Sequence, residues 1–272
     1  MDFTTTIYKN LLNSLQQQGF AFHTFNQYMA ASKTPMPTAN PDGYRGTIIL
    51  RHDVDDKSQN SLRFAKIQAS LGIMGTYYFR TIPQSYNEQI IKEMVDMGHE
   101  VGYHYETMDT CKGDVDKAYN EFCRNLEKFQ KLTSVKTISM HGSPMSPYDN
   151  REIWKKYDYK KLGIIAEPYF DINFDELFYI TDTGRQWDGH LYNVRDKATK
   201  ENPVTNPDFL NRRYHSTLDI INSVNQGTFP KQAMLNFHPQ RWNDKPLPWL
   251  KELIWQNVKN QGKRIIIRVR SK

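Results

Sequence analysis

Short apolar runs alternate with amphipathic segments through most of this 272-residue sequence. Apolar runs bounded by glycine, proline or charged residues predict strands, and apolar positions three or four residues apart predict helices. Such alternation is typical of a parallel sheet or barrel whose strands are connected by helices. We predict strands at residues 47–50, 75–79, 99–104, 135–140 and 233–237, and helices at residues 61–70, 87–97, 115–132, 217–226 and 250–261.

The fold that best explains this order is a single distorted (β/α) barrel, an α/β fold. We predict one domain over residues 1–272, in which residues 1–45 form an N-terminal covering helix and a proline-rich loop and residues 46–272 form the barrel. The covering helix is expected at residues 8–18. Further strand-like segments are residues 164–172, 177–181 and 191–194, followed by a last strand, RIIIRV, at residues 264–269.

The composition excludes disordered and fibrous proteins, because 38% of the residues are hydrophobic and 13% are aromatic. The formal net charge of +6 is partly concentrated in residues 263–272. This stretch could attract an anionic substrate or a membrane surface, although a solvated face is the simpler interpretation. We expect no nucleic-acid partner.

The two cysteines, Cys111 and Cys123, form neither a CxxC pair nor part of a metal-ligand cluster. We therefore predict that both are reduced thiols and that the protein has no disulfide framework. The N-terminus has no basic leader, and no segment reaches the roughly 20 apolar residues of a transmembrane helix. We therefore expect a soluble, cytoplasmic protein without a transmembrane segment.

Polar side chains stand at the ends of several predicted strands. Asp53 and Asp55 follow the first strand, and His104, His141 and His238 end three later ones. In (β/α) barrels the active site is built at the C-terminal ends of the strands. We therefore expect these side chains, far apart in the sequence, to meet on one face of the barrel.

The two aspartates suit a divalent ion. Asp53 and Asp55 are two residues apart, so both carboxylates can point to the same side. A cation lets both remain charged, whereas without it one would tend to protonate. One carboxylate can then bind the metal while the other acts as a base. The alternative is a loop that uses aspartate for turn formation and helix capping.

The histidines are open to several interpretations. His104 suits a zinc-type ion, which prefers nitrogen and carboxylate ligands. His141 and His238 could each donate a proton to a departing amine, bind the metal, or be packed and hydrogen-bonded. His99 begins its strand and is expected to be structural, because it would lie at the far end from the site.

A polar, sugar-sized pocket is expected beside these residues. The aromatic residues Tyr105 and Trp242 are near the site in sequence and are candidates for substrate binding, as are Arg80 and Glu106. Aromatic faces and charged hydrogen-bond donors suit hydroxylated ligands. The alternative for the aromatic residues is a place in the core.

Three segments, Arg51-His52-Asp53-Val54-Asp55, Gly75-Thr76-Tyr77-Tyr78-Phe79 and Gly98-His99-Glu100-Val101-Gly102-Tyr103-His104, resemble the polysaccharide deacetylase superfamily, the carbohydrate esterase family 4 type. That resemblance implies a distorted (β/α) barrel and a divalent metal, commonly zinc, that serves to hydrolyse N-acetyl or related groups. It also implies that Asp53 is the general base, Asp55 the first metal ligand and His104 the first histidine of a His-x-x-x-His ligand pair.

The sequence departs from that pattern at the second histidine, where Met108 stands. The candidates for the third ligand are His141, which we favour, and Glu106, which shares a strand side with His104. His238 resembles the late motif that supplies the catalytic acid, although Pro239 replaces the aspartate that usually follows. Residues 181–188 resemble the fourth motif, where an acidic and an aromatic residue support the site.

The predicted function is that of a metal-dependent hydrolase that removes an N-acyl group, above all N-acetyl, from a carbohydrate or sugar-containing precursor in surface polysaccharide biosynthesis. Its partner is then a small-molecule or oligosaccharide substrate, and its cofactor a divalent metal, above all zinc. Met108 favours an alternative, an inactive barrel that binds carbohydrate. The Asp-x-Asp pair also resembles phosphatases with an aspartyl nucleophile.

Overall fold

A computed structural model describes residues 1–31, 43–143, 146–187 and 203–270, and side chains up to residue 262. Within it, one sheet of seven parallel strands has the order β5-β4-β3-β2-β7-β6, and β1 pairs with the first half of β2. The strands are β1 (Phe20–His23), β2 (Gly46–Val54), β3 (Thr76–Phe79), β4 (Glu100–Tyr105), β5 (Ile138–Met140), β6 (Phe178–Thr181) and β7 (Gln232–Phe237).

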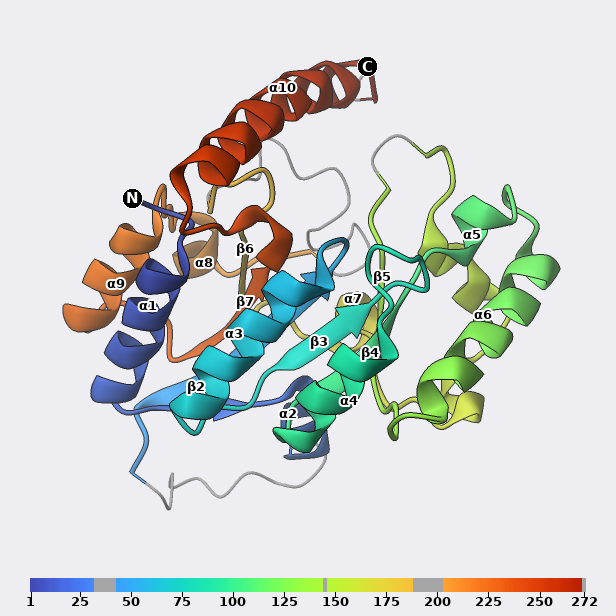
Figure 1. The fold of residues 1–272 in the computed structure, drawn as a ribbon, viewed down its shortest axis with the longest axis horizontal. Coiled ribbons are helices and arrows are strands. Elements are labelled where there is room, and N and C mark those ends of the chain that lie inside the picture. Colours follow the sequence, from blue (N-terminus) through green and yellow to red (C-terminus); the bar gives the residue numbers. More distant parts are fainter. Residues whose placement is uncertain (32–42, 144–145, 188–202, 271–272) are drawn as a thin grey trace.

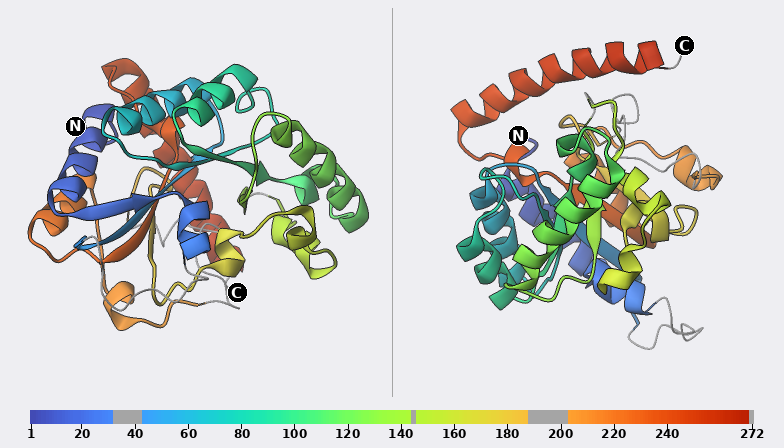
Figure 2. Two further views of the ribbon diagram at one scale, coloured as in Figure 1. Left: turned by 90° about the horizontal axis from the view of Figure 1, so that it is seen from below. Right: turned by 90° about the vertical axis from the view of Figure 1, so that its right-hand side faces the viewer.

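Helices lie around this sheet, most of them on its outer side, and the last helix of the chain crosses the top of Figure 1 away from the strands, as Figures 1 and 2 show. The longer ones are α1 (Thr5–Gln17), α3 (Ser58–Ser70), α4 (Glu88–Asp96), α6 (Val115–Gln130), α9 (Thr217–Asn225) and α10 (Pro246–Arg270). The short ones are α2 (Phe25–Ala31), α5 (Thr107–Thr110), α7 (Pro168–Asp171), α8 (Pro207–Leu210) and the 3₁₀ turns η1 (Asn150–Lys155), η2 (Tyr159–Leu162) and η4 (Pro239–Arg241). Among the described residues, no helix combines the length and the apolar character needed to cross a bilayer.

The predicted distorted (β/α) barrel is confirmed in a curled but open form. Among the described residues, β5 and β6 are the two ends of the strand order and do not pair with each other. Beyond β5, a single parallel bridge joins Thr137 to Ala166. The predicted N-terminal helix is confirmed as α1, which packs beside α9 and α3.

Local sequence explains where the helices begin. Asn87 and Asp114 each accept a hydrogen bond from a first-turn backbone NH of α4 and α6. At α9, Ser216 and Asp219 cap each other's backbone in a reciprocal capping box. These side chains satisfy NH groups that have no partner within the helix. The helices therefore start within a few residues of the positions predicted from apolar spacing.

Two predicted strands are wrong. The segment RIIIRV at residues 264–269 belongs to α10, which runs from Pro246 to Arg270. Its β-branched residues favour a strand only where a sheet offers a surface to pack on, whereas each residue added to an existing helix gains a backbone hydrogen bond. Residues 164–172 hold a single bridge at Ala166 and then α7, whose first turn begins at a proline. The predicted segment 191–194 and the loop at residues 35–41 lie outside the described residues.

Strand β2 occupies the centre of the sheet, and seven consecutive residues, 48–54, are buried. Alternate side chains of this strand point to opposite faces. Ile48, Leu50 and Val54 join the core under the helices. Asp53 points to the other face, and Asp55, the first residue after the strand, continues on that side.

His52 belongs to the helix side of β2 and is part of the core. It is fully buried, its ring stacks between Tyr77 and Phe237 at 4.1 and 5.4 Å, and its Nδ1 lies 3.0 Å from the carbonyl oxygen of Thr76. Burial lowers the pKa of His52 to about 3, although the hydrogen bond to Thr76 opposes this. The folded protein therefore keeps this histidine neutral.

Acid is expected to destabilise the fold through His52. Its pKa is about 6.5 in the unfolded chain and about 3 in the folded one, so the stabilising contribution is complete above pH 6.5 and is lost as the pH falls from 6.5 toward 3. The expected slope is about 1.4 kcal/mol of unfolding free energy per pH unit. Urea unfolding at a series of pH values should show a shallower dependence in His52→Gln. The exposed His215→Gln serves as control, and equal slopes in all three proteins would contradict the assignment.

Candidate metal centre

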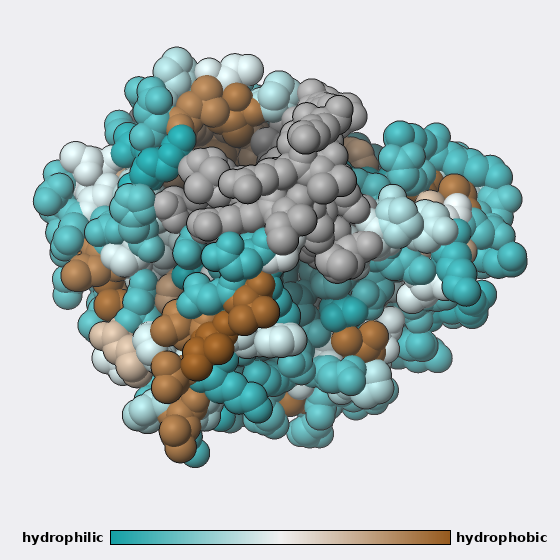
Figure 3. Space-filling model, turned by 90° about the horizontal axis from the view of Figure 1, so that it is seen from above, coloured by the Kyte–Doolittle hydropathy of each residue, from teal (hydrophilic) through white to brown (hydrophobic). Residues whose placement is uncertain are grey.

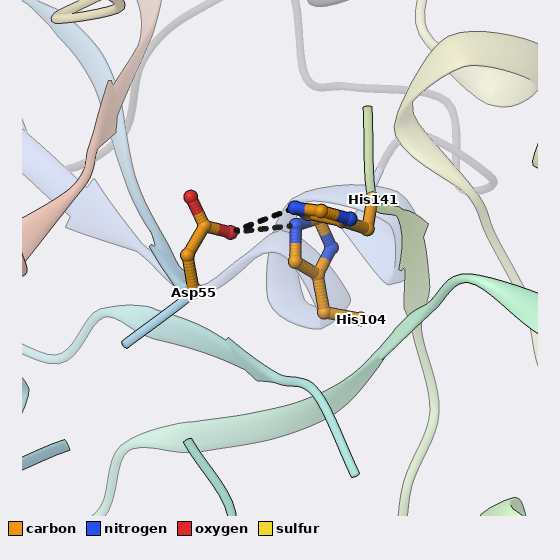
Figure 4. Close-up of side chains that lie close together, drawn as sticks. All are labelled: Asp55, His104 and His141. Atoms are coloured by element: carbon orange, nitrogen blue, oxygen red, sulfur yellow. Dashed lines mark ion pairs between the residues drawn. The ribbon is translucent and has the colours of Figure 1, made fainter. Parts of the chain in front are cut away.

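Three side chains from three parallel strands of the sheet meet where those strands end (Figure 4). Asp55 follows β2, His104 is the penultimate residue of β4, and His141 directly follows β5. The Nε2 atoms of His104 and His141 lie 3.5 and 3.6 Å from Oδ1 of Asp55. All three ligand atoms lie within 4.8 Å of one another.

This arrangement fits a divalent ion of the zinc type. Ligand atoms placed tetrahedrally at about 2.1 Å from zinc are about 3.4 Å apart, close to the separations found here. Oδ1 of Asp55 is buried and has no hydrogen-bond partner among the described residues. Burial alone would raise the pKa of Asp55, yet His104, His141 and His238 hold it well below its ordinary value. Burial opposes a charge on His104, but Asp53 and Asp55 raise its pKa. An ionised carboxylate therefore lies beside two histidine rings.

The outer nitrogen of each histidine ligand has an acceptor. Nδ1 of His104 lies 2.9 Å from the carbonyl oxygen of Ser139, and Nδ1 of His141 lies 3.2 Å from Oε2 of Glu106. These acceptors place the proton on Nδ1 and leave Nε2 free to bind a metal. Although burial opposes it, hydrogen bonds from His141 and Arg80 lower the pKa of Glu106 to about 2.

Asp53 lies beside the three ligands and is held by a buried network. Its two carboxylate oxygens accept hydrogen bonds of 2.9 and 2.8 Å from Nε and Nη2 of Arg51, and Oδ2 accepts another from Asn236 at 2.9 Å. Arg51 is fully buried and also reaches Ser139. Oδ2 of Asp53 is 3.9 Å from Nε2 of His104. This carboxylate is therefore fixed next to the metal position without being part of the ligand group.

His238 lies near Oδ2 of Asp55, the carboxylate oxygen that the other two histidines do not approach. Its Nε2 lies 3.9 Å from Oδ2 of Asp55, and its Nδ1 lies 2.6 Å from Oδ1 of Asp182. Burial opposes ionisation of Asp182, but His238 and Arg241 lower its pKa, and Trp242 donates to its other oxygen. Because Asp182 is ionised, it accepts a hydrogen bond from the NH at Nδ1 of His238. The other ring nitrogen, Nε2, faces Asp55.

A cavity of about 990 Å³ opens beside Asp55 and His141. This volume is within the range of small-molecule sites. One wall is formed by residues of α10, including Lys251, Trp255 and Lys259. Arg80, bound to Glu106 through two nitrogens, lines it near the metal centre.

The structure brings Asp53, Asp55, His104, His141 and His238 together, as the strand ends predicted. Of the two candidates for the third ligand, His141 reaches Asp55, whereas Glu106 binds His141 instead.

Two of the predicted substrate-binding residues are placed elsewhere. Tyr105 is fully buried on the helix side of β4, where its hydroxyl accepts from Trp154, because neighbouring residues of a strand face opposite sides. Trp242 is 1% exposed and packs on Phe3 and Phe237 with its Nε1 on Asp182. These two predictions are wrong, because neither side chain can reach a ligand in the cavity.

Other residues near the motif are structural. Met108, at the position of the missing histidine, is 4% exposed and belongs to the hydrophobic core. His99 is buried, as predicted for a structural histidine. Its Nδ1 accepts a hydrogen bond from the backbone NH of Gly75, and its Nε2 lies 3.0 Å from the carbonyl oxygen of Ala65.

Sequence reasoning missed Arg51, Asp182 and Gln240 as individual site residues. Gln240 donates to Oδ2 of Asp55 at 3.0 Å. The position of Arg51, two residues before Asp53 and therefore on the same strand face, was a usable signal. Asp182 directly follows a predicted strand in the same way as the other site residues.

No protein-family model and no curated protein matches this chain. The structure is similar to a CE4 domain of a multidomain xylanase from the hindgut metagenome of Trinervitermes trinervoides, with 15% identity, a TM-score of 0.41 and coverage of 80% of this chain and 84% of that one. It is also similar to a family 4 carbohydrate esterase from Streptomyces lividans in complex with acetate, with 16% identity, a TM-score of 0.38 and coverage of 80% and 90%.

A third similar structure is a wild-type CE4 family pseudoenzyme from Bacillus anthracis, with 13% identity, a TM-score of 0.39 and coverage of 79% of this chain and 60% of that one. All three carry the name of the family that the sequence motifs resemble. Because the TM-scores are below 0.5 and the identities below 25%, the chemistry of the site rests on its own side-chain geometry.

Proposed function

We propose that this protein is a metal-dependent hydrolase that removes an N-acyl group, above all N-acetyl, from a carbohydrate or sugar-containing precursor. The observation that carries the proposal is the group formed by Asp55, His104 and His141, with Asp53 3.9 Å from His104 and His238 3.9 Å from Asp55. A bound divalent ion, zinc by the donor set, supplies a Lewis acid that makes water acidic and polarises an acyl oxygen.

Asp53 is proposed as the general base. Its position beside the ligand group places a carboxylate within reach of a water molecule there, and Arg51 and Asn236 fix its orientation. A carboxylate that is held by hydrogen bonds and does not bind the ion can accept the proton as the water attacks the acyl carbon. Prior orientation of the base lowers the entropic cost of that step.

His238 is proposed as the general acid. Asp182 orients its ring through Nδ1 and leaves Nε2 as the nitrogen that can deliver a proton to the site. A departing amine needs such a proton, because the C–N bond otherwise releases a strongly basic anion. The proposed base lies 3.9 Å from His104 and the proposed acid 3.9 Å from Asp55, so both are close to the ligand group.

The cavity supports a carbohydrate-sized substrate. Its volume of about 990 Å³, the indole of Trp255 and the guanidinium of Arg80 suit a hydroxylated ligand larger than a single acyl amino group. A place in surface polysaccharide biosynthesis and a cytoplasmic location are part of this proposal, with a nucleotide sugar or a lipid-linked saccharide as the precursor.

Metal depletion and restoration test the proposed function. Protein dialysed against a chelator should release no acetate from N-acetylated oligosaccharides or nucleotide sugars, and added zinc or cobalt should restore release. His141→Ala should bind less metal and remain inactive in the presence of added zinc, whereas the exposed His215→Ala should behave as wild type. An acetate signal that is unaffected by the chelator would contradict metal dependence. A protein that binds zinc and N-acetylated sugars without hydrolysing them would support the carbohydrate-binding alternative.

A further inference from the structure

Helix α10 shows an apolar face to solvent and turns a mixed face of polar and apolar residues to the protein. Its inward residues recur at helical spacing and include Trp249, Gln256 and Asn260, of which the last two are 5% and 4% exposed. Nε1 of Trp249 donates to the backbone of Asp2, and Asn260 donates to the carbonyl oxygen of Gly184. Hydrogen bonds therefore anchor the inner face of this helix.

The outward residues of α10 form what we call the apolar stripe, which consists of Leu247, Leu250, Ile254, Trp255 and Val258. Four of them, at positions 247, 250, 254 and 258, recur every three or four residues and so share one side of the helix. Their exposed fractions are 80% for Leu247, 47% for Leu250, 57% for Ile254, 54% for Trp255 and 59% for Val258. Figure 3 shows an apolar band on this face of the molecule. A surface helix that serves only its own fold turns its apolar stripe toward the core, so the outward stripe of α10 has no role in the packing of the described part of this chain.

The charges beside the apolar stripe are positive. Lys251 lies within the stripe and Lys259 beside it, stacked over Trp255 at 5.0 Å. Glu252 is the one acidic residue in the sequence of α10. Its side chain is only 13% exposed and lies 3.9 Å from the ammonium group of Lys57. The sequence continues with five basic and no acidic residues in positions 263–272. The helix thus combines outward apolar residues, an aromatic ring and cations.

We propose that α10 is an interfacial helix that binds the protein to an anionic lipid surface. Apolar side chains with lysines at their edges match the acyl and headgroup zones of such a surface, where tryptophan is also favoured. A second copy of the chain fits less well, because pairing two stripes would bring lysines of the same charge together. The proposal does not depend on the reaction at the metal centre.

The apolar stripe adjoins the mouth of the cavity. Two members of the apolar stripe, Leu247 and Trp255, also line the cavity. So does Lys251, which lies within the stripe. With α10 lying on a lipid surface, the opening that leads to Asp55 and His141 is therefore placed at the headgroup level.

Co-sedimentation with vesicles tests this proposal on the full chain. Wild-type protein should bind vesicles of phosphatidylcholine with phosphatidylglycerol at least tenfold more strongly than vesicles of phosphatidylcholine alone, and added salt should weaken binding. The double variant Leu250→Glu, Ile254→Glu should lose at least tenfold in partitioning. The matched control is Leu218→Glu in α9, where an apolar residue 53% exposed lies outside the stripe, and it should bind as wild type.

A charge series and a fluorescence measurement complete the test. Lys251→Glu with Lys259→Glu should weaken binding to anionic vesicles, whereas the exposed Lys92→Glu should not. Brominated lipids should quench wild-type fluorescence more than that of Trp255→Phe. Undiminished vesicle binding by the stripe variants, provided that their circular dichroism is native, would overturn the proposal. So would a wild-type dimer that binds no vesicles and dissociates in the stripe variants.

Discussion

Replacement of Asp55 by alanine is expected to remove both the bound metal and turnover. Asp55 supplies the carboxylate of the ligand group, and its Oδ1 lies 3.5 and 3.6 Å from the two histidine nitrogens. Loss of a mere hydrogen-bond partner of a ligand lowers metal affinity by about 10–100-fold, and loss of the ligand itself should cost more. Metal analysis after dialysis and acetate release under saturating substrate measure the two effects.

The control for Asp55→Ala is Asp96→Ala, which removes an exposed carboxylate from the end of α4. It should keep the metal stoichiometry and the rate of wild type. A folded Asp55→Ala protein that retains wild-type metal content would show that the ion is held elsewhere, and the proposed centre would then be wrong.

Asp53→Asn is expected to lower turnover by about 10²–10⁴-fold while the protein keeps its metal. Asparagine preserves the shape of the side chain but cannot accept a proton from water. Asp53 stands outside the ligand group, and its nearest approach to a ligand is 3.9 Å from His104. Single-turnover acetate release and metal content, both measured on the same preparation, separate the two properties.

The stability of Asp53→Asn needs a parallel measurement, because Arg51 is fully buried and pairs with Asp53. Removal of one partner of a buried pair costs about 3–5 kcal/mol. Assays should therefore be made well below the unfolding temperature of the variant. Equal loss of metal in Asp53→Asn and Asp55→Ala would overturn the separation of base and ligand.

The fold was predictable where sequence pattern and packing agree. The strands that became β2, β3, β4 and β7 are short buried runs in the middle of the sheet, and burial on both faces is what their composition indicates. RIIIRV has the same composition, but no strand edge receives it, and it continues α10. A local pattern cannot indicate whether a sheet neighbour exists.

The site was predictable to the extent that strand ends determine position. His141 follows β5 and meets Asp55, although Met108 had removed the expected partner of His104. The direction in which each side chain points was harder to predict. Tyr105 follows His104 in sequence but points to the opposite side of the strand, and Trp242 follows the His238 turn but packs inward on Asp182. Proximity in sequence predicts where a residue lies, but the alternation of side chains along a strand decides which way it points.

The origin of the three ligands on separate strands makes the ion a tertiary cross-link. A His-x-x-x-His pair is assembled within one turn of chain, whereas here Asp55, His104 and His141 come into register only after β2, β4 and β5 have paired through β3. Binding of the ion is then linked to formation of the sheet, and metal saturation should raise the midpoint of thermal unfolding by mass action. Short peptides that carry any one of these segments should lack affinity for the ion.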